Sequence, residues 1–197
     1  MAEATYLIAP ERYVQPTFVV RCRRPGDGAQ VAEAINASYE HLKTFMGWAT
    51  AEQSVERSEQ LSREFYSKWL QAKDFPLALW DREEARILGG SGYHLREGPL
   101  ELGNAEIGMW IRADAAGRGL GTAVLRALLH WGFTEWPWLR LSWRCSNANT
   151  ASQRVAEKAG MRREGVLRSH AVDPGGLRRD TVCYAMLRDE WLAQPQA

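Results

Sequence analysis

The sequence has few cysteines, no excess of either charge and no long apolar run, and each of these absences excludes a class of protein. The 3 cysteines, Cys22, Cys145 and Cys183, lie far apart, so the chain has neither a disulfide framework nor a C-x-x-C metal clip. The 4 histidines lack the spacing that sets two metal ligands on one helix face, and we expect no metal site. Nowhere do 18 apolar residues follow one another, and the first residues do not resemble a signal peptide, so we expect a cytoplasmic protein that does not bind membranes.

The balance of charge gives no sign of nucleic-acid binding, because the chain has 25 basic and 24 acidic residues and a formal net charge of +1. Such a chain has no net positive electrostatic field that would attract nucleic acid, and we expect no direct nucleic-acid partner. The length of 197 residues suits one domain with a sizeable core. We therefore expect a single domain over residues 1–197, with an N-terminal extension at 1–15 and a core at 16–192.

Hydrophobic periodicity predicts an α/β chain with more strands than helices. Alternating runs bounded by turn residues predict strands, and apolar residues three and four apart predict helices. Thr50 and Gln53 fit a capping box at the start of the second helix. The expected strands lie near residues 18–23, 76–80, 85–89, 105–111, 139–145, 162–172 and 177–187, and the expected helices near 31–43, 50–72, 120–136 and 149–159.

The segment from Trp110 to Thr122 carries the chemical signal, because a strand ends there, Gly117, Gly119 and Gly121 follow, and a helix begins. Glycines let the backbone approach a ligand closely, and the free amides and dipole of a helix start attract anions such as a pyrophosphate. The P-loop lysine and the third glycine of a dinucleotide fingerprint are missing, which excludes those nucleotide-binding classes. The alternative is a tight turn before a helix with no ligand.

These residues resemble the GNAT superfamily of acyl-CoA-dependent N-acetyltransferases, whose pyrophosphate loop reads Arg/Gln-x-x-Gly-x-Gly/Ala. Gly119 to Gly121 match its last three positions, while Ala116 stands where the family usually has Arg or Gln. The runs at 105–111 and 149–168 and the Asp189-Glu-Trp191 segment resemble the RimJ/RimL branch. The resemblance implies a mixed, mostly antiparallel sheet of about seven strands, splayed at strands 4 and 5 and flanked by about four helices.

The resemblance also implies a binding site for acetyl-CoA between the two splayed strands. The backbone of Met109, Trp110 and Ile111 would hold the pantetheine arm, and Asn149 would hold a pantetheine amide or, alternatively, cap the next helix. The amides expected at the pyrophosphate belong to Gly117, Arg118, Gly119, Leu120, Gly121 and Thr122, and Arg118 could add a charged contact.

Two residues are the candidates for acid and base catalysis. Alternation places Glu106 and Gly108 on one strand face, so Glu106 could take the proton of the acceptor ammonium, directly or through water; the alternative is a salt-bridged or solvated glutamate. The position at which many family members carry an acidic tyrosine is Ala156 here. Ser152 matches the RimJ/RimL serine and could bind the coenzyme sulfur and donate to the departing thiolate, or it could make a backbone contact in the first helical turn.

Trp48, Tyr93 and His170 are the candidates for the wall of the acceptor site, with plain packing as the alternative, whereas Trp69, Trp131 and Trp143 read as core residues. The resemblance implies an enzyme that transfers acetyl by direct attack in a ternary complex, with the N-terminal α-amine of a protein, of the ribosomal-protein type, as the leading acceptor. A small amine such as a polyamine or aminoglycoside is the second reading, and a noncatalytic acyl-CoA-binding module is the third. A homodimer is expected from the resemblance alone.

Overall fold

The computed structural model describes residues 7–194, which fold around one mixed sheet with the strand order β1-β2-β3-β4-β5-β6-β8-β7. All neighbouring strands run antiparallel except β5 and β6. The strands are β1 (Arg12–Val14), β2 (Phe18–Cys22), β3 (Phe75–Asp81), β4 (Ile87–His94), β5 (Asn104–Ile111), β6 (Arg140–Ser146), β7 (Arg162–Val172) and β8 (Arg178–Leu187).

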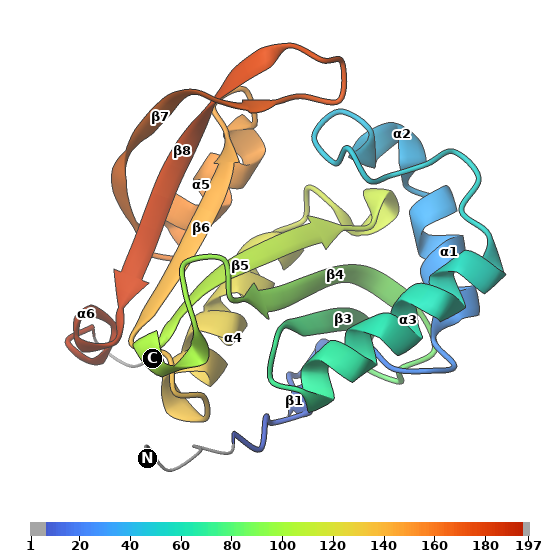
Figure 1. The fold of residues 1–197 in the computed structure, drawn as a ribbon, viewed down its shortest axis with the longest axis horizontal. Helices are drawn as coiled ribbons and strands as arrows, with labels where there is room; N and C mark the ends of the chain where they lie inside the picture. The colour runs from blue at the N-terminus through green and yellow to red at the C-terminus, as the bar shows by residue number, and fades with distance from the viewer. Residues whose placement is uncertain (1–6, 195–197) are drawn as a thin grey trace.

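Helices cover both faces of this sheet (Figure 1). Helices α1 (Gly28–Asn36) and α3 (Val55–Leu70) lie over β3 and β4 on one side, and α4 (Leu120–Thr134) lies on the other. The remaining helices are α2 (Tyr39–Leu42), α5 (Thr150–Lys158) and α6 (Arg188–Leu192), and two 3₁₀ turns lie at Leu100–Leu102 and Ala113–Ala115.

Alternation along the strands divides the core into two apolar clusters. The larger cluster packs the α4 side and contains Leu141, Trp143 and Cys145 of β6, while Val19 and Trp80 belong to a smaller cluster under α1. Successive side chains of a strand point to opposite faces, so the polar residues between Leu141 and Cys145 must face away from the larger cluster. The sheet therefore presents a polar surface beside β6 on the side opposite α4.

The two central parallel strands separate along their length, as Figure 1 shows. Pairing between β5 and β6 stops after Asn104↔Arg140, Ala105↔Leu141 and Glu106↔Ser142. Beyond Glu106, β5 stays paired with β4 alone, and β6 stays paired with β8 alone. The expected splay is confirmed, and it opens the sheet where the glycine segment begins.

The structure corrects the expected boundaries at the N-terminal end. An eighth strand, β1, forms within the expected extension and pairs with β2, and the ring of Tyr13 stacks on Trp131. The second long helix begins at Val55 rather than near Thr50, because Ser54 is its N-cap and accepts a hydrogen bond from the Arg57 amide at 3.0 Å. Thr50 and Gln53 bond to each other in the preceding turn.

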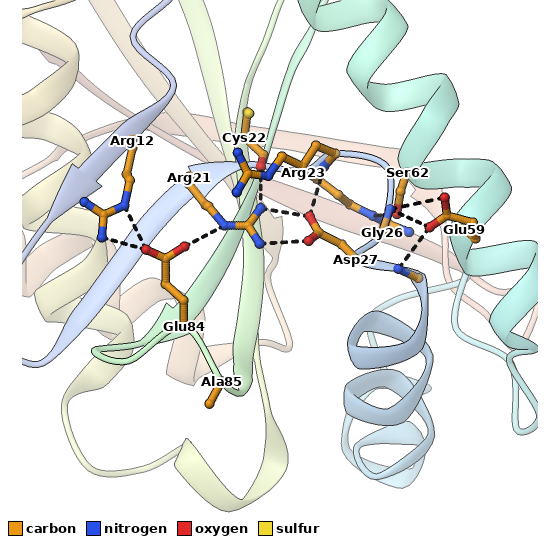
Figure 2. Close-up of polar contacts among 12 residues, drawn as sticks. Arg12, Arg21, Cys22, Arg23, Gly26, Asp27, Glu59, Ser62, Glu84 and Ala85 are labelled. Carbon is orange, nitrogen blue, oxygen red and sulfur yellow. Dashed lines mark hydrogen bonds and ion pairs between the residues drawn. The ribbon is translucent and has the colours of Figure 1, made fainter.

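A partly buried network of ion pairs and hydrogen bonds joins β2 to α1 and α3 (Figure 2). Arg21 donates two hydrogen bonds to the Asp27 carboxylate, at 2.8 and 2.9 Å, and a third to Glu84 at 2.9 Å. Glu59 of α3 accepts from the Gly26 and Gly28 amides at the start of α1. The network thus fixes α1, which borders the opened part of the sheet.

Candidate active-site cleft

A cleft with a volume of about 2020 Å³ begins where β5 and β6 separate. Its walls come from both splayed strands, the starts of α4 and α5, the segment between α1 and α3, and the β7 strand. This single cleft contains most of the residues that the sequence singled out. Within residues 7–194, no group of His, Cys, Asp and Glu is placed to bind a metal, and no helix is long and apolar enough to cross a membrane.

The glycine segment forms the floor of one end of the cleft. Gly117 and Gly119 have left-handed backbones with φ of +77° and +88°, and a Cβ atom at either position would meet no atom within 4 Å. Gly119 is the N-cap residue of α4, so the first free amides of this helix lie beside open space. A left-handed backbone favours glycine, and the space beside it suits an anion at the helix start.

Not every residue of the segment faces the cleft. Gly117, Gly119, Gly121 and Thr122 line it, whereas the Leu120 side chain packs against the core. Arg118 is exposed and is not among the lining residues. The amides of Leu120 and Arg118 can still serve an anion, but the Arg118 side chain gains no support from the structure.

The segment is held in place by Arg112, which is buried although it carries a charge. Its guanidinium forms ion pairs with Glu33 of α1 and with Asp114. The hydrogen bond from Arg112 lowers the pKa of Glu33, and the pKa of Arg112 is raised in return. The Ser38 hydroxyl accepts a further bond from the Ala113 amide at 3.1 Å. The glycine segment and the end of α1 therefore form one fixed unit.

Met109, Trp110 and Ile111 line the cleft from β5, as expected. They pair with β4 on one side, and the β5–β6 pairing ends before them on the other. Their β6-facing backbone groups are thus available to a chain that adds to the strand edge, the property required for holding a pantetheine arm.

Ser152 lies at the cleft wall in the first turn of α5. The indole Nε1 of Trp143 donates a hydrogen bond to the Ser152 hydroxyl oxygen at 3.0 Å. Asn149 caps the same helix, because its side-chain oxygen accepts from the Ser152 amide at 3.0 Å. The capping role of Asn149, one of the two uses expected, is confirmed, and Asn149 also lines the cleft.

Glu106 also borders the cleft, but its carboxylate is buried and ion-paired. One carboxylate oxygen accepts a bond from Arg96, and the other lies 3.6 Å from Nε of Arg144. The salt-bridged alternative for Glu106 therefore describes its contacts. A proton taken up by this carboxylate would weaken both ion pairs, so its role as base stays a prediction that the geometry does not favour.

The three residues expected at the acceptor wall have different positions. Trp48 is half exposed, lines the cleft and meets Trp110 edge to face with ring centroids 6.1 Å apart. His170 lines the cleft from β7 and contacts the Thr181 hydroxyl at 3.1 Å. The prediction for Tyr93 was wrong. Its ring is fully buried, and its hydroxyl donates to the Leu128 carbonyl of α4 at 2.6 Å.

The residue next to Tyr93 reaches the cleft instead, and the sequence analysis missed it. His94 lines the cleft, and its Nδ1 lies 2.8 Å from Oδ1 of Asp74, the residue before β3. The available signal was the alternation of β4, in which Gly90, Gly92 and His94 share a face. Two small residues beside a histidine indicate an open surface that the imidazole can occupy.

Comparisons with known proteins agree with this geometry. An acetyltransferase (GNAT) domain matches residues 19–162. The chain is 26% identical over 189 residues to the "Putative ribosomal N-acetyltransferase YdaF" of Bacillus subtilis, and the matched region covers 90% of this chain and 95% of that protein. It is 31% identical over 120 residues to the uncharacterised N-acetyltransferase YnaD of Bacillus subtilis, over 61% of this chain and 67% of that protein.

Solved structures share the fold at lower identity. RimL, a ribosomal-protein alpha-N-acetyltransferase in complex with coenzyme A, superposes with a TM-score of 0.81 and 19% identity over 91% of this chain and 99% of that one. The ribosomal-protein-S5-alanine acetyltransferase of Vibrio fischeri superposes with a TM-score of 0.79 and 17% identity, over 94% and 100% of the two chains. These likenesses confirm the expected architecture.

Proposed function

The chain belongs to the GNAT family of acetyltransferases, and from that premise we propose that it acetylates the N-terminal α-amine of a protein, with a ribosomal protein as the leading class of acceptor. The enzyme is an acetyl-CoA-dependent N-acetyltransferase, as the family and the relatives indicate. The proposal concerns the acceptor and the residues that act on it. A cytoplasmic location and a homodimer stay predictions.

The residues of the cleft fit the coenzyme part by part. The left-handed glycines at 117 and 119 leave open space at the start of α4, where a pyrophosphate would face free amides. The unpaired edge of β5 at residues 109–111 suits the amides of a pantetheine arm. This order directs the arm from the glycine segment toward Gly108 and Glu106, so the thioester belongs at the point where β5 and β6 separate.

Acetyl transfer at that point needs a neutral amine, a stabilised oxyanion and a donor for the departing thiolate. Ser152 is the proposed donor. Its hydroxyl oxygen accepts a bond from Trp143, and its own hydrogen can turn from the neighbouring Cys145 sulfur toward a coenzyme sulfur in the cleft. The bound coenzyme supplies the activated acetyl group, and the chain positions the amine, removes its proton and donates to the sulfur.

The observation that carries the choice of acceptor is the match to the YdaF protein along nearly its whole length. The breadth of the cleft supports a peptide, since its lining extends beyond the coenzyme-binding elements to Trp48, between α2 and α3, and to His170 of β7. The aromatic pair of Trp48 and Trp110 gives the acceptor side an apolar wall on which a peptide backbone or side chain can pack.

The test measures thiol release from acetyl-CoA against N-terminal peptides of ribosomal proteins, polyamines and aminoglycosides. We expect turnover on peptides with a free α-amine and none on the same peptides when that amine is blocked. Ser152→Ala should lower kcat by roughly tenfold or more, as loss of an acid catalyst does. Ser67→Ala, on the exposed face of α3, is the matched control and should leave kcat unchanged. Turnover confined to small amines would contradict the proposed acceptor and leave the acetyltransferase activity intact.

A further inference from the structure

The structure pairs a histidine with a carboxylate inside the cleft, and neither residue has a role in the site described so far. Nδ1 of His94, at the end of β4, lies 2.8 Å from Oδ1 of Asp74. Both side chains are mostly buried, with 18% and 24% of their surface exposed, and both line the cleft. A carboxylate accepts but does not donate, so Nδ1 carries the hydrogen of this bond. The lone pair of neutral His94 is then on Nε2.

The position of Nε2 follows from two glycines on adjacent strands. Gly92 and Gly108 are register partners of β4 and β5, and the imidazole of His94 lies over both. A Cβ atom at Gly92 would lie 2.8 Å from Nε2, and one at Gly108 would lie 3.2 Å from it. The absence of side chains at Gly92 and Gly108 therefore leaves room for the imidazole of His94. Nε2 lies over the middle of β5, next to the residues proposed to hold the pantetheine arm.

We infer that His94, oriented by Asp74, is the general base that removes the proton of the acceptor ammonium. This inference rests on amine acetylation at the proposed thioester position and does not depend on which amine is the acceptor. Glu106, the register partner of His94, is the rival. Its two oxygens face Arg96 and Arg144, whereas Nε2 of His94 has no competing partner among the described residues.

The step balances without any further reactant. Nε2 takes one proton from the acceptor ammonium, and the freed nitrogen lone pair forms a bond to the thioester carbonyl carbon. The carbon–sulfur bond then breaks, and its electron pair leaves on the coenzyme sulfur, which takes a proton. The new amide loses its remaining surplus proton, so acetyl-CoA and an ammonium yield an amide, the free thiol and one proton released to solvent through His94.

The test compares His94→Gln, Asp74→Asn and Glu106→Gln with the wild-type enzyme on the best acceptor found. We expect His94→Gln to lower kcat by about 100-fold or more, as removal of a general base does, without changing the KM for acetyl-CoA. Asp74→Asn should lower kcat in the same direction by about tenfold or more, because it favours the wrong tautomer. His130→Gln, on the exposed surface of α4, is the matched control and should leave both constants unchanged.

Two readouts separate a base from a structural role. A hydrazine is less basic than the matching amine, so more of an acceptor analogue with a hydrazine in place of its α-amine is neutral at a given pH, and the loss caused by His94→Gln should shrink on it. Added imidazole should restore part of the activity of His94→Gly. A kcat of His94→Gln within twofold of wild type would overturn the inference and leave amine acetylation standing. So would an acceptor-dependent loss found in Glu106→Gln alone, which would make Glu106 the base. A wild-type enzyme inert on every amine would overturn the proposed function and the base together.

Discussion

At the scale of single residues, the hydroxyl of Ser152 depends on a neighbour that sequence patterns assign only to the core. Trp143 is buried in the larger apolar cluster, and its indole also donates to the Ser152 oxygen. The Cys145 thiol shares a hydrogen bond with the same serine, although burial raises the pKa of the thiol. Trp143 is thus a positioning residue for the proposed acid.

Trp143→Phe should preserve most of the packing and remove the donor that orients Ser152. We expect kcat to fall about fivefold to tenfold, the effect of losing one hydrogen bond, with little change in the KM for acetyl-CoA. Trp131→Phe makes the same change at a buried indole that bonds Glu135 away from the cleft. It should lower the melting temperature without lowering kcat. Equal effects of both variants on kcat would show that Trp143 only packs.

Residues also show where sequence reasoning ends. Alternation correctly grouped Glu106 with Gly108, and it equally groups Gly92 with His94, yet it does not say which face of a strand opens into a cleft. Tyr93 was therefore assigned to the acceptor wall although it points into the core, and His94, one residue later, lines the cleft. The bond from His94 to Asp74 joins the end of β4 to the residue before β3 and has no local signature.

At the scale of elements, the glycine segment and α4 form the proposed anion-binding unit, in which Gly119 has a left-handed backbone at the helix start. The start of this helix was predictable, because glycines after a strand and before an apolar helical stripe have a local cause. The contacts that anchor the glycine segment were not predictable from the sequence. Arg112 reaches Glu33 on a helix that is distant in the sequence, and only the folded chain brings the two together.

Gly119→Ala should weaken binding of acetyl-CoA more than it weakens the fold. The added Cβ meets no protein atom, so the cost in the free enzyme is the left-handed backbone, about 1 to 2 kcal/mol. In the complex the methyl group would also occupy space beside the pyrophosphate. We expect the KM for acetyl-CoA to rise at least tenfold.

Gly176→Ala is the matched control, since this hairpin glycine has φ of +84° and equally open surroundings. It should lower the melting temperature similarly and leave the KM unchanged; a similar KM increase in both variants would contradict a role of Gly119 at the pyrophosphate.

At the scale of the whole molecule, the mixed, mostly antiparallel sheet and its splay followed from the resemblance, and the local patterns placed most elements within a few residues. The eighth strand was missed because Arg12–Val14 is short and gains its order from β2 and from the stacking of Tyr13 on Trp131. Such a strand forms through tertiary contacts rather than through its own propensity. The ion pairs that join distant segments likewise form only through tertiary contacts and have no local sequence signal.

Carboxylates held by ion pairs and, at Glu59, by the Gly26 amide should make the stability of the whole chain dependent on pH. The pKa values of Glu33, Glu59, Glu84, Asp114 and Glu164 are lowered in the folded protein. At Glu84, burial opposes the shift, but hydrogen bonds from Arg12 and Arg21 outweigh it and lower the pKa. Carboxylates of this kind have an ordinary pKa of about 4 in the unfolded chain, so below about pH 5 the unfolded state binds more protons than the folded state.

The free energy of unfolding should therefore be level between about pH 7 and pH 5 and decrease as the pH falls further toward the lowered folded-state values. Urea unfolding at half-unit steps from pH 7 to pH 3 measures this curve. Glu84→Gln should reduce stability at pH 7 and make the acid decline shallower, because one of the responsible carboxylates is gone and Arg21 loses a partner. A curve that stays level down to pH 3.5 would show that these ion pairs contribute as little in the folded state as exposed surface pairs do. A steep decline unchanged by Glu84→Gln would place the sensitivity in the other four carboxylates, with the pair between Arg112 and Glu33, beside the glycine segment, as the next to replace.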